Sequence, residues 1–266
     1  MPITEALEGR LKNLCLLFFT ERYQSEAERA EKEGLNHIGY LNFLVQGEWE
    51  RRHHQRIDRL LKQAQIPRNK RLIDFEVTRI PRLSPSLVHR LAEGDFIDRC
   101  ENILMFGNPG TGKTHLSIAL TREWCLKGRR VLYISACNLV QELLRAKQIM
   151  QLDQAIKKLD RFEVLIIDDI SYLACDRNES DVLFALLSAR YEQRSVVITS
   201  NLVFSEWHTV FKDETTATAA IDRLVHHATV LELNVESYRI QKAKGCGASK
   251  KQSESSTKEV KTVSGN

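Results

Sequence analysis

Short apolar runs alternate with amphipathic segments over the second part of the chain. The runs occupy residues 103–106, 131–135, 164–168, 196–200 and 229–233. Most of them are continuous and rich in β-branched residues, which is typical of strands that are buried on both faces of a sheet. The intervening residues 114–127, 138–151 and 178–192 have the length of helices, and Gly128 follows the first of them where glycine commonly ends a helix. This alternation predicts an α/β fold with a parallel five-stranded sheet between helices.

The first part of the chain has a different pattern. Residues 1–75 are rich in charged side chains and predict a small all-helical domain. Pro81 and Pro85 interrupt the connector that leads into the first strand, and residues 76–243 are assigned to the α/β domain together with this connector. Residues 244–266 are polar, and we predict a disordered tail there because they cannot bury enough surface to offset chain entropy.

Composition and charge narrow the class of protein. The 266 residues are 42% hydrophobic and 28% charged, with a net charge of +4, as in ordinary soluble globular proteins. The six cysteines form no C-x-x-C pair, which favours reduced thiols. The apolar run LCLLFF near the N-terminus has only about six residues and is too short to cross a bilayer. These features predict a cytoplasmic protein with no membrane partner.

Two pairs of adjacent histidines, His53-His54 and His226-His227, are candidate metal ligands. Neighbouring residues on a helix point about 100° apart, so the two rings of such a pair are not expected to bind one ion. We therefore predict no structural metal in this chain.

Residues 107–114 read GNPGTGKT and match the phosphate-binding pattern G-x-x-x-x-G-K-[ST] at every fixed position. An apolar strand precedes this P-loop and a helix follows it, as the pattern requires. Backbone N–H groups of such a loop surround phosphate oxygens. Lys113 is expected to reach the β- and γ-phosphates, and the Thr114 hydroxyl is expected to bind Mg²⁺. The predicted nucleotide-binding residues are Gly107, Asn108, Pro109, Gly110, Thr111, Gly112, Lys113, Thr114 and His115.

Polar side chains end two further predicted strands. Asp168 closes the run VLIID about 55 residues after Lys113, where a parallel sheet would bring it beside the phosphates to hold Mg²⁺. Asp169 follows and could orient the attacking water. Asn201 follows the run VVITS and could bond the γ-phosphate or that water. Taken alone, the two acids would also fit solvated strand ends, and Asn201 would fit an ordinary turn.

Arg223 lies on the predicted helix before the last strand. Its guanidinium could enter the nucleotide site of a neighbouring subunit and neutralise the charge that develops on the γ-phosphate. A lone arginine on a helix is more often part of a surface ion pair, so its position alone does not separate the two roles.

These segments together resemble the IstB-like ATPases, the transposition helper proteins of bacterial insertion sequences, which are related to the DnaC-type helicase loaders of the AAA+ class. The resemblance runs from about residue 35 to residue 240 and rests on NILMFGNPGTGKTHLSIAL, on VLIIDDISYL and on the more specific FSEW and DRLVHHA. It implies an ATPase that uses Mg²⁺. The roles that it implies are the Walker A pair for Lys113 and Thr114, the Walker B acid for Asp168, sensor I for Asn201 and the arginine finger for Arg223. Asp169 stands where many AAA+ proteins carry glutamate, and its shorter reach suggests slow hydrolysis.

The chain departs from the family pattern at a few positions. Ser171 stands where the family usually has glycine, and Leu202-Val203 stand where Arg-Pro often follows the sensor asparagine. Neither departure removes a catalytic group. Arg239 is a candidate substitute for a sensor II arginine, and the sequence leaves its role open. Because few residues separate the last strand from the tail, we predict an AAA+ core without a helical lid domain.

A basic stretch lies near the end of the helical region. On a helix over residues 47–65, Arg52, Arg56 and Arg59 fall on one face, where they could neutralise DNA phosphates without reading bases. The same pattern is typical of a solvated helix face. The predicted DNA-binding residues are Arg51, Arg52, Arg56, Arg59 and Lys62. The family resemblance implies a homo-oligomer on double-stranded DNA, with little sequence preference and with a transposase as its partner.

Two other functions share the same active-site residues. A DnaC-type loader would place a replicative helicase on single-stranded DNA, and a nucleotide-dependent scaffold would bind ATP and hardly hydrolyse it. The stretches FLVQGEWERR and FSEW favour the transposition helper over the loader. A turnover assay would separate the scaffold from both.

Overall fold

The computed structural model describes residues 3–67, 69–173, 176–211 and 214–235. The chain divides into two compact units, one that runs up to Leu60 and one that begins at Leu61. This division falls earlier than residue 75, where composition changes, and the functional boundary at residue 75 stays a prediction. The predicted tail and Arg239 lie outside the described residues.

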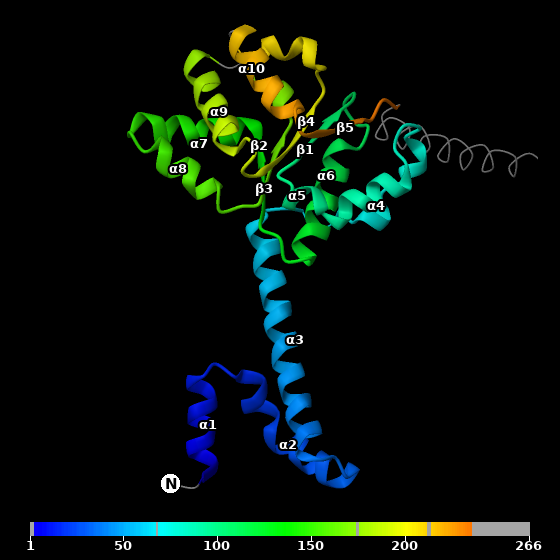
Figure 1. Ribbon diagram of the computed structural model, residues 1–266, viewed down its shortest axis with the longest axis vertical. Helices are drawn as coiled ribbons and strands as arrows, with labels where there is room; N and C mark the ends of the chain where they lie inside the picture. Colours follow the sequence, from blue (N-terminus) through cyan, green and yellow to red (C-terminus); the bar gives the residue numbers. More distant parts are fainter. Residues whose placement is uncertain (1–2, 68, 174–175, 212–213, 236–266) are drawn as a thin grey trace, which may run out of the picture. The chain divides into compact units, whose positions relative to one another are not determined.

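The N-terminal unit consists of helices. They are α1 (Ile3–Asn13), α2 (Leu17–Glu33) and the larger part of α3 (His37–Gln63) (Figure 1). Gly47 allows α2 to approach α3 closely, because a Cβ atom at this position would lie 2.1 Å from the ring of Phe18. The helical N-terminal region that composition predicts is therefore present, and α3 begins earlier than residue 47.

Glu48 is a buried acid between α2 and α3, with an exposed fraction of 4%. Its carboxylate accepts hydrogen bonds from the backbone N–H of Phe18 at 2.8 Å, from the Arg51 guanidinium at 2.6 Å and from the Arg52 guanidinium at 2.7 Å. Burial raises the pKa of Glu48, but these donors together outweigh burial and lower the pKa to about 2. The ionised carboxylate therefore joins the start of α2 to the middle of α3.

We expect Glu48→Gln to destabilise the N-terminal unit, because two guanidinium groups lose their charged acceptor. Loss of a hydrogen bond to a charged group costs about 1.5–3 kcal/mol of unfolding free energy. The folded-state pKa lies below the ordinary value, so this stabilisation is complete above a pH of about 4.5 and is lost as the pH falls towards about 2. Thermal melts followed by circular dichroism, at about pH 7 and about pH 3, measure both effects.

Glu50→Gln is the matched control, because Glu50 is exposed on the same helix and its carboxylate contacts only the Gln46 amide among the side-chain contacts in the described part of the chain. The control should melt like the unchanged protein at both pH values. Equal melting of the two variants at about pH 7 would contradict a structural role for the Glu48 carboxylate.

The second unit is built on a parallel sheet with the strand order β2-β3-β4-β1-β5 (Figure 1). Its strands are β1 (Asn102–Phe106), β2 (Val131–Ser135), β3 (Val164–Asp168), β4 (Ser195–Ser200) and β5 (Ala228–Glu232). The register pairs Phe106 with Ser200 and Ser135 with Asp168. The carboxyl ends of β1, β2, β3 and β4 therefore meet at one edge of the sheet. The predicted α/β class and parallel five-stranded sheet are confirmed, with strand bounds shifted by at most one residue.

Helices cover both faces of this sheet. They are α4 (Pro85–Glu93), α5 (Asp95–Asp98), α6 (Lys113–Leu126), α7 (Ala136–Gln148), α8 (Leu152–Leu159), α9 (Arg177–Arg190) and α10 (Glu214–Val225). Figure 1 shows α4, α5 and α6 on one side of the strands and α7 to α10 on the other. On the second side, Leu104 and Phe106 of β1 belong to a core that includes Leu139, Leu183 and Leu224. Alternate strand residues thus serve opposite layers.

Short 3₁₀ turns complete the second unit. They are η1 (Leu72–Asp74), η2 (Val77–Arg79), η3 (Ile170–Tyr172) and η4 (Phe204–Thr209). Within the described ranges, none of the helices combines the length and apolar character that a bilayer crossing requires. The absence of a lid domain concerns residues beyond 235 and stays a prediction.

Candidate functional site

The P-loop joins β1 to α6 and depends on glycine at two positions. Gly107 and Gly112 have φ angles of 152° and 106°, which favour glycine. A Cβ atom at Gly107 would lie 2.4 Å from the carbonyl oxygen of Leu233, and one at Gly112 would lie 3.0 Å from the ring of Phe75. The loop therefore folds tightly onto its neighbours and leads directly into the N-terminus of α6, where backbone N–H groups and the helix dipole favour a phosphate.

Lys113 is the first residue of α6, and its side chain is buried. Its ammonium donates to the carbonyl oxygens of Gly107 at 2.6 Å and Asn108 at 3.1 Å, and to Oδ1 of Asn201 at 2.6 Å. Burial lowers the pKa of Lys113, and the negative charges of Asp169 and Asp168 oppose this shift. The P-loop, the end of β4 and the two acids therefore meet at this ammonium.

Asp168 ends β3 at the same edge of the sheet and is surrounded by hydroxyl groups. Its carboxylate accepts hydrogen bonds from Thr199 Oγ1 at 2.6 Å and from the hydroxyl of Tyr133. Thr114 Oγ1 lies 3.4 Å from each carboxylate oxygen, which is long for an O–H···O hydrogen bond. A hydroxyl and a carboxylate in this arrangement are the hard oxygen ligands that Mg²⁺ prefers, so these residues fit that ion.

Tyr133 was not among the predicted site residues. It lies on β2 within the apolar run VLYIS, which predicts a core strand and gives no sign of a polar contact. Burial raises the pKa of the Tyr133 hydroxyl, and its hydrogen bond to Asp168 raises it further. The hydroxyl is therefore a fixed donor to the carboxylate. Only the pairing of β2 with β3 brings the two residues together.

Asp169, Ser171 and Asn201 connect β3 to β4 at the site. Asp169 has a φ angle of 58°, and its backbone N–H donates to Thr199 Oγ1 at 2.8 Å. The Ser171 hydroxyl accepts a hydrogen bond from the backbone N–H of Asn201 at 2.6 Å. Ser171, which stands where the family usually has glycine, therefore adds a hydrogen bond that positions Asn201. The Asn201 side chain in turn accepts a hydrogen bond from Lys113.

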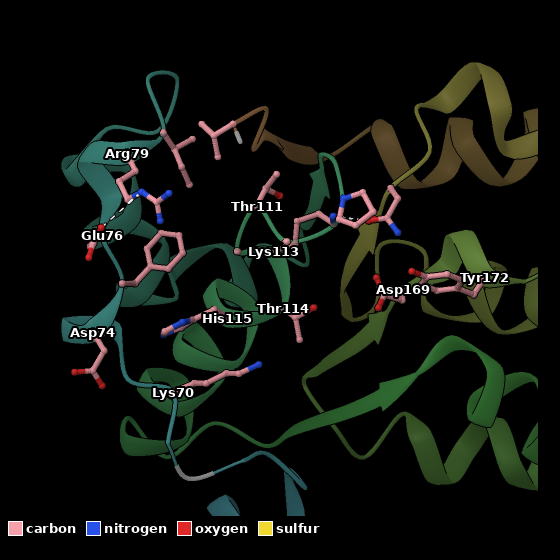
Figure 2. Close-up of a pocket in the computed structure, with 17 residues that line it drawn as sticks. Lys70, Asp74, Glu76, Arg79, Thr111, Lys113, Thr114, His115, Asp169 and Tyr172 are labelled. Carbon is pink, nitrogen blue, oxygen red and sulfur yellow. Dashed lines mark hydrogen bonds and ion pairs between the residues drawn. The ribbon is translucent and has the colours of Figure 1, made fainter. Parts of the chain in front are cut away.

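Lys113, Thr114, Asp169 and Asn201 line one pocket with a volume of about 290 Å³ (Figure 2). The P-loop, the connector before α4 and the ends of β3 and β4 supply its lining: Lys70, Asp74, Phe75, Glu76, Arg79, Ile80, Pro109, Gly110, Thr111, Gly112, Lys113, Thr114, His115, Asp169, Tyr172, Asn201 and Val235. His115 packs edge-on against Phe75, with ring centroids 5.5 Å apart. The connector residues were missed in the sequence because they follow no periodic pattern.

Comparison with known proteins decides the family. The sequence pattern of the IstB-like ATP binding protein family matches residues 9–246. The chain belongs to this family.

Named relatives of this IstB-like chain come from insertion sequences. An insertion sequence ATP-binding protein of Sinorhizobium fredii is 45% identical over 91% of this chain and 82% of its own length. The ATP-binding protein named for insertion sequence IS21 of Pseudomonas aeruginosa is 40% identical over 91% of each chain. The crystal structure of the DnaC helicase loader matches 62% of this chain and 97% of its own, with 15% identity and a TM-score of 0.53. That likeness shows a shared fold.

Arg223 of the IstB-like chain lies away from its own pocket. Among the described residues that line the pocket, Arg223 is not present. Its guanidinium donates to the carbonyl oxygen of Ala219 at 2.9 Å and lies 4.9 Å from the centroid of the Phe184 ring. Its predicted role as an arginine finger stays a prediction, and it would require a second subunit.

The predicted DNA-binding residues of the IstB-like chain all lie on α3, with different surroundings. Arg51 and Arg52 contact Glu48, at side-chain exposures of 21% and 53%. Arg56, Arg59 and Lys62 are exposed, and Arg59 Nε donates to the carbonyl oxygen of Gln55 at 3.2 Å. Arg51 and Arg52 thus have a structural role within the N-terminal unit, and DNA binding by the set stays a prediction.

Proposed function

We propose that this chain is an ATP-hydrolysing transposition helper, which oligomerises on double-stranded DNA and recruits or activates a transposase. Membership of the IstB-like family and the insertion-sequence origin of its relatives support the biological role. The observation that carries the chemical part is a pocket of about 290 Å³ lined by Lys113, Thr114 and Asn201, with the Asp168 carboxylate 3.4 Å from the Thr114 hydroxyl.

Each residue has a defined task in this proposal. Lys113 exchanges its protein acceptors for the β- and γ-phosphate oxygens, while Thr114 and Asp168 hold Mg²⁺, which neutralises phosphate charge when bound. Asp169 lines the pocket and orients the attacking water, and Asn201 bonds that water or the γ-phosphate. Among the described residues Arg223 does not line the pocket of its own subunit, so in this proposal a neighbouring subunit supplies it as the arginine finger. Hydrolysis then acts as a switch on assembly.

A mixing experiment tests shared sites between subunits. Arg223→Ala and Lys113→Ala proteins should each lose DNA-stimulated hydrolysis of ATP. In their mixture, some interfaces combine an intact Lys113 with an intact Arg223, and activity should return. Arg161→Ala, which changes an exposed arginine in the turn after α8, is the control and should stay active. A mixture that remains inactive, although each protein still oligomerises, would contradict the proposal that a neighbouring subunit supplies Arg223 as the arginine finger.

DNA binding is tested by fluorescence anisotropy with a duplex of about 60 base pairs and a matched single strand, each with and without ATP and Mg²⁺. We expect duplex binding that requires ATP and is lost in Lys113→Ala. Arg56→Ala and Arg59→Ala should each weaken binding and reduce the slope of log affinity against log salt by about 1. Arg22→Ala, an exposed arginine on α2, should change neither. Failure to bind either nucleic acid would remove the DNA partner.

The helicase loader is the second candidate, because the α/β unit shares its fold with the DnaC helicase loader. A preference for single strands over duplex in the same assay would favour it. Tight ATP binding without turnover would favour the scaffold, in which Asp169 is too short to position the attacking water.

The hydroxyl of Tyr133 supports the Walker B acid, and its removal should slow hydrolysis. Tyr133→Phe keeps the ring in the core and deletes one donor to Asp168, so we expect about a five- to tenfold lower turnover number. ATP affinity should change by less than about twofold, since the hydroxyl contacts the acid and not the pocket lining. Steady-state turnover and equilibrium binding of ATP separate the two quantities. Tyr191→Phe, a half-buried tyrosine at the other end of the sheet, is the control.

A further inference from the structure

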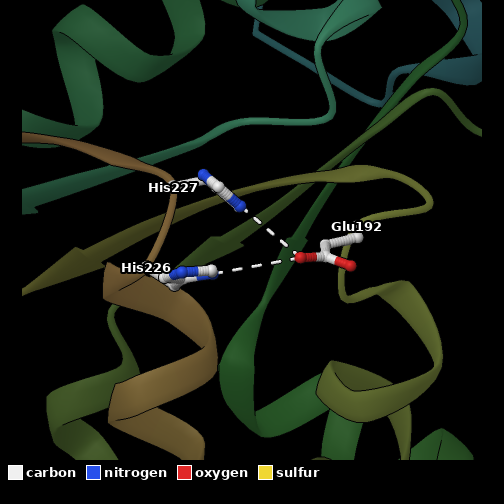
Figure 3. Close-up of side chains that lie close together, drawn as sticks. All are labelled: Glu192, His226 and His227. Atoms are coloured by element: carbon white, nitrogen blue, oxygen red, sulfur yellow. Dashed lines mark ion pairs between the residues drawn. The ribbon is translucent and has the colours of Figure 1, made fainter.

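Glu192, His226 and His227 lie close together on the surface of the second unit (Figure 3). Glu192 belongs to the turn between α9 and β4, and both histidines belong to the turn between α10 and β5. Each residue offers a ligand atom, and these atoms lie within 4.8 Å of one another. Glu192 Oε1 is 3.5 Å from His227 Nε2 and 3.9 Å from His226 Nδ1.

The geometry of the histidine pair differs from the helical arrangement that the sequence predicts. Helix α10 ends at Val225, so His226 and His227 follow it in a turn, and their ring centroids are only 4.1 Å apart. Neighbouring side chains on a helix diverge by about 100°, but this pair follows the helix, so its rings are not held apart in that way. Two imidazole rings side by side, with a carboxylate next to them, are a set of residues that can bind one metal ion.

The backbone holds the three residues in place. The carbonyl oxygen of His227 accepts a hydrogen bond of 2.7 Å from the backbone N–H of Asn102, at the start of β1. Glu192 has a φ angle of 56°, a conformation that few residues other than glycine adopt, and this directs the tight turn before β4. The ligands thus stand before the amino ends of β4 and β5, which flank β1 in the sheet, at the edge opposite the P-loop.

From this arrangement we propose that Glu192, His226 and His227 form a binding site for a divalent transition-metal ion, with Zn²⁺ as the best match. Two imidazole nitrogens and one carboxylate oxygen are ligands that Zn²⁺ accepts, and water completes the coordination because all three residues are exposed. Ligands of a tetrahedral zinc ion are about 3.3 Å apart, so small side-chain rotations bring the observed separations into range.

A bound ion would join the turn before β4 to the end of α10, the helix that carries Arg223. The site is far from the reacting phosphates, and its effect is to fix the C-terminal end of that helix. Tyr191 competes with the ion, because its hydroxyl lies 2.8 Å from His226 Nδ1, the nitrogen that would bind the metal. The phenol must release this nitrogen when the ion binds.

Calorimetric titration of the full chain with Zn²⁺, in buffer without nucleotide and with excess Mg²⁺, tests the proposal. We expect one ion per chain. Glu192→Gln, His226→Gln and His227→Gln should each lower the Zn²⁺ affinity at least about tenfold, because even the loss of a residue that only hydrogen-bonds to a metal ligand lowers metal affinity about 10–100-fold. Tyr191→Phe should bind as tightly as the unchanged protein or more tightly. Zn²⁺ should also raise the melting temperature of the unchanged protein and leave that of the triple variant unaltered.

The double variant His53→Gln/His54→Gln is the matched control. Those rings are also adjacent and exposed, but their centroids are 6.4 Å apart on α3 and His53 stacks on Trp49. The double variant should keep the full Zn²⁺ affinity of the unchanged protein. The proposal is overturned if the triple variant binds Zn²⁺ like the unchanged protein, or if no binding occurs up to about 0.1 mM Zn²⁺. Melting of each variant without metal shows whether it has folded.

Discussion

Replacing Lys113 by methionine is expected to reduce ATP hydrolysis at least about a hundredfold, the usual effect of removing a group that stabilises charge in the transition state. Methionine has nearly the same length as lysine but no charge. The ammonium lies where the P-loop and the end of β4 meet, whereas Lys70, the other lysine of the pocket lining, comes from the connector before α4. ATP affinity should fall as well, because the β-phosphate loses the same contact.

The fold should survive this substitution. Burial lowers the pKa of Lys113, so the charged side chain is less favourable in the folded protein than in the unfolded one near neutral pH. Removal of the charge offsets the loss of its three hydrogen bonds. Melting curves should therefore stay close to those of the unchanged protein, while a phosphate-release assay records the loss of turnover.

Lys147→Met provides the control for Lys113. Lys147 is a solvent-accessible lysine on α7 that contacts Asp181 at 3.3 Å, and its removal should leave hydrolysis unchanged. If Lys113→Met retained more than about a tenth of the activity, the pocket around the P-loop would not be the place of hydrolysis.

Replacing Asp168 by asparagine should separate binding from hydrolysis. The amide keeps the size of the carboxylate, and the hydroxyls of Tyr133 and Thr199 can rotate to suit it. What is lost is the negative charge that would retain Mg²⁺ beside Thr114. We therefore expect turnover to fall at least about a hundredfold, with ATP still bound.

Two measurements check this expectation. Equilibrium binding of ATP should show an affinity within about tenfold of the unchanged protein, and raising Mg²⁺ should restore part of the turnover. Asp181→Asn changes an exposed acid on α9 and serves as the control. Full activity in Asp168→Asn would mean that Asp169 or another acid holds the ion.

The sheet and the P-loop could be predicted from sequence because both depend on local patterns. Strands buried on two faces are continuous apolar runs, and the loop conformation requires glycine at fixed positions such as Gly107 and Gly112. The hydrogen bond from Tyr133 to Asp168 depends on pairing between two strands, so neither run alone reveals it. The hydrogen bond from the backbone N–H of Phe18 to the Glu48 carboxylate depends likewise on how α2 meets α3.

The pair His226-His227 shows a second reason why sequence alone does not predict a site. Its geometry is decided by where α10 ends, and the position of a helix end is less certain in a sequence than the presence of the helix. A helix that ended one turn later would separate the rings, while the end at Val225 places them side by side. For this pair, the prediction of no metal assumed that the helix continues through both histidines.

The three oxygens that hold the Lys113 ammonium have a consequence for nucleotide exchange. Because these hydrogen bonds must break before the lysine can reach a phosphate, the affinity for nucleotide is the difference between two sets of bonds and not the strength of the new set alone. The same oxygens are ready to receive the ammonium again when the phosphates leave. The protein therefore competes with its own ligand, which lowers the affinity for the nucleotide and favours its departure.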